Sequence, residues 1–250
     1  MIWMVALATF LTSALSSVFG MLGGLLLMAI LVEWFSVPQA FVLHGLFQLT
    51  ANGYRAWLNR ADILWRPVRF FLVGVGALLL VLGFLTFSPD RAWVLIALGL
   101  VPFAASAIPD GWRLKISTPS HAGLAGVVVG GVNVVAGVAG PLLDVFFQQS
   151  ELNRKQVVAT KAVLQSFGHV AKVGYFLWLA GFVAVAAAEV PTMGLLVAGM
   201  VASVFGTTVG KQVLDRLTDD FFFRWTQRIL WGIGAFLLAR GLMTLIGPSA

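Results

Sequence analysis

The sequence predicts an all-α integral membrane protein built from two repeats of four apolar segments. Of the 250 residues, 60% are hydrophobic and only 10% are charged, whereas soluble domains carry roughly a quarter charged residues. The charged residues gather in short stretches, and the apolar segments between them are near or above the roughly 20 residues that cross a bilayer. In addition, a shift of 117 positions brings the two halves of the chain into register without a gap.

Apolar runs bounded by charged residues, proline and glycine define eight segments. We expect them to form a single transmembrane domain over residues 1–250, with repeat 1 at about 3–108 and repeat 2 at about 121–246. The segments cover roughly residues 3–33, 38–58, 67–87, 92–108, 121–148, 156–179, 181–209 and 221–246.

The formal net charge of +6 does not indicate nucleic-acid binding, because the basic residues lie in short loops between apolar segments. This distribution is the positive-inside pattern, which reports the orientation of a multi-pass protein. We therefore expect a protein of the cell (inner) membrane that contacts the lipid bilayer and a small molecule but no nucleic acid. The chain has no cysteine, which excludes disulfides and thiolate metal sites. We expect neither a cofactor nor a metal site.

The two halves agree best at polar positions. Each half carries four polar residues spaced by 4, 4 and 3 positions, and these lie within an arc of about 80° on a helix of 3.6 residues per turn. The stripes consist of His44, Gln48, Asn52 and Arg55 in the first half and of Lys161, Gln165, His169 and Lys172 in the second.

Charges in equivalent loops predict that the repeats have opposite orientations. In the first half, the loop after the second segment is basic and the next loop is nearly neutral. In the second half, residues 173–188 carry no charge and the following connection is basic. Opposite charge bias in equivalent loops implies that the two repeats have inverted topology. Two repeats of four full spans cannot be inverted, however, because an even number of crossings returns the chain to the side of the membrane where it began. We therefore expect each repeat to begin with a re-entrant hairpin, followed by three spanning helices.

Each first segment contains a candidate break for such a hairpin. The breaks are FGMLGG at 19–24 and AGVAGP at 136–141. Glycines and a proline in mid-segment end one half-helix and start another. Irregular backbone is tolerated at membrane depth where protein or a water-filled cavity surrounds it. The alternative is a pair of kinked full spans whose glycines permit close helix packing.

A resemblance to a known family rests on two stretches of the second half, GGVNVVAGVAGPLL and NRKQVVATKAVLQSFGHVAK. These are similar to the TauE/SafE family of sulfite exporters, also called the TSUP family, and the resemblance extends over nearly the whole chain. The first copy departs from the pattern, because GMLGGLLLM lacks the longer glycine run and FVLHGLFQL lacks the alanine-threonine pair. Family members move sulfur-containing anions such as sulfite and sulfonates, so the resemblance implies transport of a small sulfur oxyanion.

The breaks also offer what an anion needs within a membrane. N-termini of half-helices carry unsatisfied N–H groups and the positive end of the helix dipole. In inverted-repeat transporters these termini point at the substrate. We expect such termini at Gly23 and Gly24 and at Gly140 and Pro141, with close helix packing as the alternative role.

Two lysines are candidates to supply positive charge to the site. Lys172 lies deep in its segment, where a buried lysine costs roughly 2.5–3.5 kcal/mol and usually faces a cavity or a partner. Alternatively, it marks the far interface. Lys161 lies closer to the start of its helix and could instead snorkel to the interface.

Neutral donors complete the predicted pocket. Asn52 and His169 can donate hydrogen bonds to sulfonate oxygens, and the paired Gln48 and Gln165 suit a site on a pseudo-twofold axis. Interhelical hydrogen bonds would account for the same residues. Asn133 and Thr160 are weaker candidates.

Three residues are candidates for proton coupling. His169 titrates near neutral pH when unperturbed. Asp144 follows the second glycine break, and Glu189 precedes a proline in an apolar stretch. Either carboxylate could pair with a lysine or relay protons.

These features favour a transporter of small sulfur-containing oxyanions, such as sulfite or organosulfonates, bound in a central pocket between the repeats. A passive anion channel is the alternative. An intramembrane enzyme would need a nucleophile with its base, a carboxylate pair or a metal cluster. The three histidines are scattered and the carboxylates within apolar segments are isolated, so we expect that the protein is not an enzyme.

Overall fold

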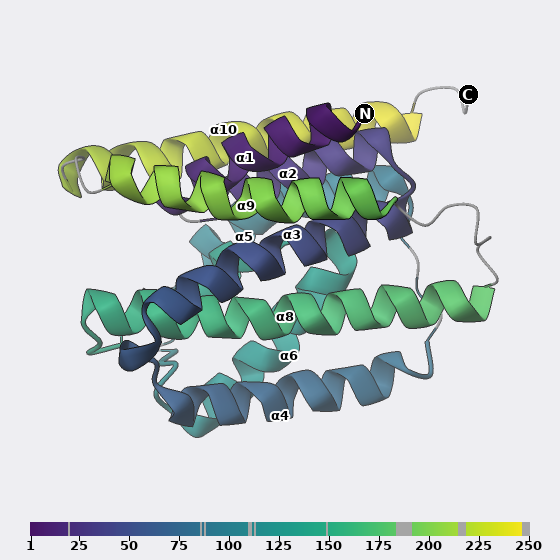
Figure 1. Cartoon of the computed structure of the whole chain (residues 1–250). Coiled ribbons are helices and arrows are strands. Elements are labelled where there is room, and N and C mark those ends of the chain that lie inside the picture. Colours follow the sequence, from purple (N-terminus) through teal and green to yellow (C-terminus); the bar gives the residue numbers. More distant parts are fainter. Residues whose placement is uncertain are drawn as a thin grey trace.

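The computed structural model describes residues 1–19, 21–85, 87, 89–109, 112, 114–148, 150–183, 192–214 and 219–246. Its regular structure is helical throughout these residues, as the sequence predicts (Figure 1). In chain order the described elements are α1 (Ile2–Phe19), α2 (Leu22–Trp34), α3 (Val37–Leu58), the 3-10 turn η1 (Arg60–Asp62), α4 (Trp65–Leu82), α5 (Arg91–Ala107), α6 (Pro119–Ala136), α7 (Gly140–Gln148), α8 (Arg154–Val183), α9 (Met193–Leu214) and α10 (Asp219–Ile246).

Both predicted helix breaks are confirmed. The first segment is divided into α1 and α2, and the fifth into α6 and α7. α6 ends because Gly137 adopts a left-handed conformation with φ +77°, and its N–H donates to the Asn133 carbonyl. Such a cap satisfies an end carbonyl of the helix, and glycine adopts this conformation without a steric penalty from Cβ. The members of each broken pair, α1 with α2 and α6 with α7, pack against each other.

The helices that follow the two broken pairs, α3 and α8, begin with similar capping boxes. At the start of α3, the N–H of Ser36 donates to the Gln39 side chain over 3.2 Å. At the start of α8, the N–H of Asn153 donates to Gln156 over 3.3 Å, and the N–H of Gln156 donates back to Asn153 over 3.0 Å. A reciprocal cap of this kind satisfies helix-end donors that otherwise lack partners. The two boxes lie 117 positions apart.

The helices pack in pairs that join the two halves of the chain. α1 packs along α9, and α6 packs along α4. α3 packs on α8, and α5 packs on α10. Small residues allow this closeness: a methyl group at Gly206 would overlap with the Phe10 carbonyl in α1, and one at Gly126 would overlap with the Phe71 carbonyl in α4.

Among the residues that the structure describes, five helices are long and apolar enough to cross a membrane, namely α1, α4, α6, α9 and α10. Large apolar side chains on several helices face outward rather than into the fold; examples are Val73 and Leu80 of α4 and Phe236 of α10, which are 68%, 72% and 67% exposed. A bilayer, not water, is the solvent that suits such surfaces. These are the features of a membrane protein.

Two boundaries differ from the sequence prediction. The seventh segment was placed at 181–209, whereas α8 continues to Val183 and α9 begins at Met193. Residues 173–188 carry no charge that could mark the boundary, and the first charged residue after them is Glu189. Moreover, α1 and α6 have 18 residues each, about 27 Å at 1.5 Å per residue. They therefore reach through most of a hydrocarbon core of roughly 30 Å, further than a half-membrane hairpin arm.

Candidate functional site

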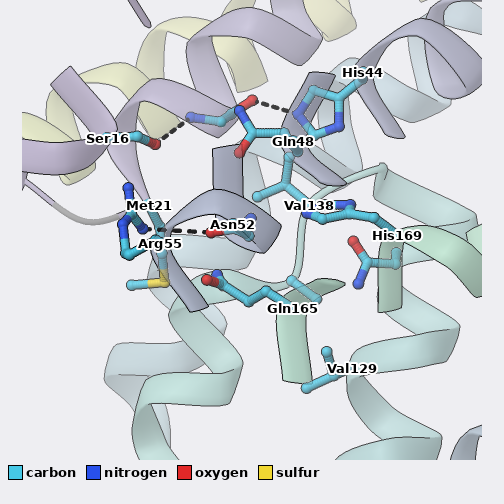
Figure 2. A pocket seen from close by; sticks show the side chains of 14 residues that line it. Ser16, Met21, His44, Gln48, Asn52, Arg55, Val129, Val138, Gln165 and His169 are labelled. Atoms are coloured by element: carbon cyan, nitrogen blue, oxygen red, sulfur yellow. Dashed lines mark hydrogen bonds between the residues drawn. The ribbon is translucent and has the colours of Figure 1, made fainter. Parts of the chain in front are cut away.

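A cavity of about 30 Å³ lies where the two helix breaks meet α3 and α8 (Figure 2). This volume has room for about two water molecules, at roughly 10–15 Å³ each, so a larger ligand requires the lining side chains to move. Its polar lining consists of His44, Gln48, Asn52 and Arg55 on α3, Gln165 and His169 on α8, Ser16 on α1 and Asn133 on α6.

Six of the residues expected at the site line this cavity: Gly24, Gln48, Asn52, Gly140, Gln165 and His169. The sequence therefore located the cavity through its two polar stripes and its two breaks. Gly23, Pro141, Lys161 and Lys172 do not line it. Gly23 instead packs against the backbone of α1 at Thr12, and Pro141 is buried in the first turn of α7.

Lys161 forms an ion pair with Asp144, between α8 and α7. The pair accounts for both residues, because each neutralises the other in a partly buried place with 17% and 33% of the side chains exposed. Neither lines the cavity, and substrate binding by Lys161 stays a prediction. Thr160, the weaker candidate, accepts a hydrogen bond from the N–H of Leu64 over 3.0 Å. Glu189 lies outside the described residues.

Lys172 is completely buried behind the wall of the cavity. Its Nζ lies 2.7 Å from Nδ1 of His44 and 2.8 Å from the carbonyl oxygen of Gly137. The charged end of this side chain therefore reaches past the cavity to the end of α6, which is why a residue of the predicted stripe is not a lining residue.

Arg55 supplies the positive charge at the cavity. Its guanidinium donates to Oδ1 of Asn52 and to Oγ of Ser17, each over 3.3 Å, and the first of these bonds is visible in Figure 2. Among the described residues it forms no ion pair with a carboxylate. No lining residue is acidic. A half-buried cation without a counter-ion favours an anion beside it.

Three buried polar groups around the cavity lack a hydrogen-bond partner. They are Nε2 of Gln48, Oδ1 of Asn133 and Nδ1 of His169, on side chains that are 5%, 3% and 6% exposed. Leaving such a group unpaired costs about 1–3 kcal/mol. Groups of this kind are retained where a ligand or water pairs with them.

The start of α2 is not fully available to a ligand. The N–H of Gly24 donates to Oγ of Ser16 over 3.2 Å, and the Gly24 carbonyl accepts from Nε2 of His44 over 2.9 Å (Figure 2). Of the N–H groups that the first break was expected to offer, the one at Gly24 is therefore already capped. At the second break, Ala139 and Gly140 line the cavity.

Ser16 was not singled out by the sequence, and Asn133 was ranked low. One signal links them, because Ser16 and Asn133 lie 117 positions apart, the same interval that separates Gln48 from Gln165. Both precede a helix break by a few residues. Met21 and Val138, also 117 apart, line the cavity as well.

The arrangement is chemically suited to a small anion, since it combines one guanidinium with amide, imidazole and hydroxyl donors and no carboxylate. Comparison of the chain with protein-family models, with curated proteins and with solved structures returns no match. The resemblance to sulfite exporters therefore rests on the short motifs of the sequence.

Proposed function

We propose that the protein is a membrane transporter that binds a small sulfur-containing oxyanion, such as sulfite or an organosulfonate, in the cavity between α3 and α8. One observation carries this proposal: Arg55 and the unpartnered Nε2 donor of Gln48 face a cavity that has no acidic lining residue. An oxyanion would pair with this charge and this donor, which are costly to leave unsatisfied. The resemblance to TauE/SafE proteins supports the choice of a sulfur oxyanion.

The lining of the cavity supports a site shared by two repeats. Four pairs of lining residues lie 117 positions apart: Ser16 and Asn133, Met21 and Val138, Gln48 and Gln165, and Asn52 and His169. A ligand on a pseudo-twofold axis is contacted by equivalent positions of both repeats, as in transporters with a midplane site.

The packing of the helices supports the same relation. When the described helices of the two halves are matched in chain order, α1 is equivalent to α6 and α4 to α9. The packing of α1 on α9 and the packing of α6 on α4 are then equivalent contacts, each formed between the first helix of one half and the fourth helix of the other. α3 packs on α8 and α5 on α10, and these are the contacts that equivalent helices make across a pseudo-twofold axis.

The positions of the described helix ends support an inverted arrangement. The start of α1 and the end of α10 lie toward the same side in Figure 1, and the end of α3, the starts of α4, α8 and α10 and the end of α9 lie toward the other. The second group carries most of the basic residues, including Arg60, Arg66, Lys155, Lys211 and Arg228. By the positive-inside rule, we place that side in the cytoplasm and both termini outside it, in a multi-pass protein of the cell (inner) membrane.

Transport of sulfite and methanesulfonate into proteoliposomes tests the proposed function. We expect saturable uptake, whereas a passive channel gives flux that does not saturate. Arg55→Gln should raise the apparent KM roughly 10- to 150-fold, because a hydrogen bond to a charged group contributes about 1.5–3 kcal/mol.

Arg60→Gln is the matched control. Arg60 is exposed near the end of α3, where it stacks on Trp57 at 5.4 Å and donates to the Trp57 carbonyl. Thermal unfolding of Arg55→Gln separates loss of binding from loss of fold, since Arg55 also bonds to Ser17. Absence of saturable flux of both anions, in vesicles that are shown to contain folded protein, would refute the proposal.

A further inference from the structure

A chain of hydrogen bonds connects the two helix breaks through His44 and Lys172. His44 contacts the Gly24 carbonyl in the first turn of α2 at 2.9 Å and Nζ of Lys172 at 2.7 Å. Lys172 in turn donates to the carbonyl of Gly137, which caps α6, at 2.8 Å. Both side chains have no exposed surface. This series of hydrogen bonds thus connects one half of the protein to the other.

The partners determine where the hydrogens lie. A carbonyl oxygen can only accept, so Nε2 of His44 carries the proton that points at Gly24. Nδ1 of a neutral imidazole is then the acceptor, and Lys172 is the donor. The Lys172 amino group donates a second hydrogen bond to the Gly137 carbonyl, and its Nζ lies 5.7 Å from the centre of the Phe41 ring, within the range of a cation–π interaction. With Lys172 as an ammonium and His44 as a neutral imidazole, the pair carries one positive charge.

No described carboxylate balances that charge. Lys172 forms no ion pair among the described residues. From α8, His169 faces His44 edge to face, with ring centres 5.6 Å apart. From α3 itself, Arg55 adds a second positive charge at the same cavity.

The helices packed against α3 and α8 add no acidic group near the pair. Asp144 of α7 is paired with Lys161, and Glu33 at the end of α2 is paired with Arg91 and Arg240. α1 contains no titratable side chain. The remaining ones lie toward helix starts or ends: Arg66 and Arg69 of α4, His121 of α6 and, among the described side chains of α9, Lys211.

We propose that the His44–Lys172 pair is a proton-binding site, and that the protein takes up one proton at Nδ1 of His44 with each anion that enters the cavity. The inference rests on the proposed function and names the coupling ion for that same site. A proton on Nδ1 turns the acceptor into a donor, so two cations face each other at 2.7 Å. That state is stable only when an anion lies beside His44, whose ring lines the cavity. Anion and proton therefore favour each other's binding.

Protonation of His44 at Nδ1 also changes the hydrogen bonds that connect the two helix breaks. With a proton on Nδ1, Lys172 can no longer donate to His44, whereas the bond from His44 to Gly24 and the bond from Lys172 to Gly137 remain. The link between the start of α2 and the end of α6 opens as a result. Coupled binding of anion and proton thereby releases one half of the protein from the other, which is what alternating access requires.

Proton uptake on anion binding tests the inference directly. Purified full-length protein in weak buffer with a pH indicator is mixed with methanesulfonate, which stays a monoanion throughout the experiment. We expect about one proton taken up per anion bound, and a Kd that falls as pH falls by at most about tenfold per pH unit. Thermodynamic linkage requires that the measured proton uptake per anion agree with the pH dependence of Kd.

Three single variants assign the proton, because the chain has three histidines. His44→Gln retains a donor for Gly24 but has no site for the proton, so uptake should vanish and Kd should become independent of pH. The remote His121→Gln should keep the uptake unchanged. His169→Gln, at a residue of the cavity, should weaken anion binding but keep about one proton taken up per anion bound. Retained uptake in His44→Gln, or anion binding without proton uptake in His169→Gln, would overturn the assignment.

The wild-type measurement does not depend on whether a variant folds. Binding of methanesulfonate without proton uptake and without pH dependence would overturn the proton site while leaving the proposed function in place. No binding of methanesulfonate or sulfite at any pH between about 5.5 and 8 would overturn the proposed function itself.

Discussion

Gly23 lies directly against the backbone of Thr12, where α2 folds back on α1. A methyl group at position 23 would overlap with the Thr12 carbonyl oxygen and would come within 2.7 Å of the Ser16 nitrogen. The neighbouring Gly24 differs, because the nearest atoms to a methyl group there belong to the Gln48 amide at 3.6–3.7 Å, an ordinary van der Waals distance. Two adjacent glycines thus have separate roles, one in packing and one at the cavity.

This difference predicts opposite results for two alanine substitutions. Gly23→Ala should lower the melting temperature or prevent folding, because overpacking against backbone costs about 1–3 kcal/mol or more. Gly24→Ala should fold normally, because the methyl group fits, but should weaken methanesulfonate binding because it fills space beside Gln48. Thermal unfolding in detergent and calorimetric titration measure the two effects. Equal melting temperatures for the two variants would contradict the assigned role of Gly23.

Gln48 should show a conflict between stability and function. Its Nε2 is buried without a partner, at a cost of about 1–3 kcal/mol in the empty protein. Gln48→Met has a similar length and no polar atom to satisfy, so the melting temperature should rise. Anion affinity should fall by about 1 kcal/mol, roughly fivefold, through loss of one neutral hydrogen bond.

Thr50→Val is a suitable control on the same helix, because the Thr50 hydroxyl already donates to the Leu46 carbonyl at 2.9 Å. This substitution should change affinity little. If Gln48→Met were less stable than the wild type and bound the anion equally well, the amide would have a structural partner and no role in binding.

The sequence predicted the parts of the fold that depend on local chemistry. A glycine ended α6 where expected, since Gly137 has a left-handed backbone that other residues adopt at a cost. The polar stripe on α3 also pointed at the cavity, because helix periodicity fixes the direction of short side chains. Gln48 and Asn52 are examples.

The lysines show where sequence reasoning stops. Periodicity places Lys172 on the same face as Gln165 and His169, but its four-carbon chain carries the ammonium to His44 and Gly137. Lys161 is likewise directed by a tertiary partner, Asp144. Periodicity gives the face from which a long side chain starts, whereas its end depends on helices distant in sequence.

The orientation of the two halves gives the last prediction. The chain lacks cysteine, so single cysteines report which side of the membrane each loop occupies. Asp62→Cys, in the turn between α3 and α4, and Lys211→Cys, near the end of α9, should resist an impermeant thiol reagent in intact cells. Asp90→Cys, before α5, and Thr192→Cys, before α9, should react with it. All four should react after permeabilisation, which shows that each thiol is accessible.

The pattern is diagnostic because it compares equivalent loops. Asp62 and Thr192 lie between the third and fourth helices of their respective halves, and Asp90 and Lys211 lie near the connection between the fourth and fifth. Inverted halves place the members of each pair on opposite sides of the membrane. Parallel halves place them on the same side. Labelling of both Asp62→Cys and Thr192→Cys in intact cells, or of neither, would therefore rule out inversion, and with it the pseudo-twofold axis through the cavity.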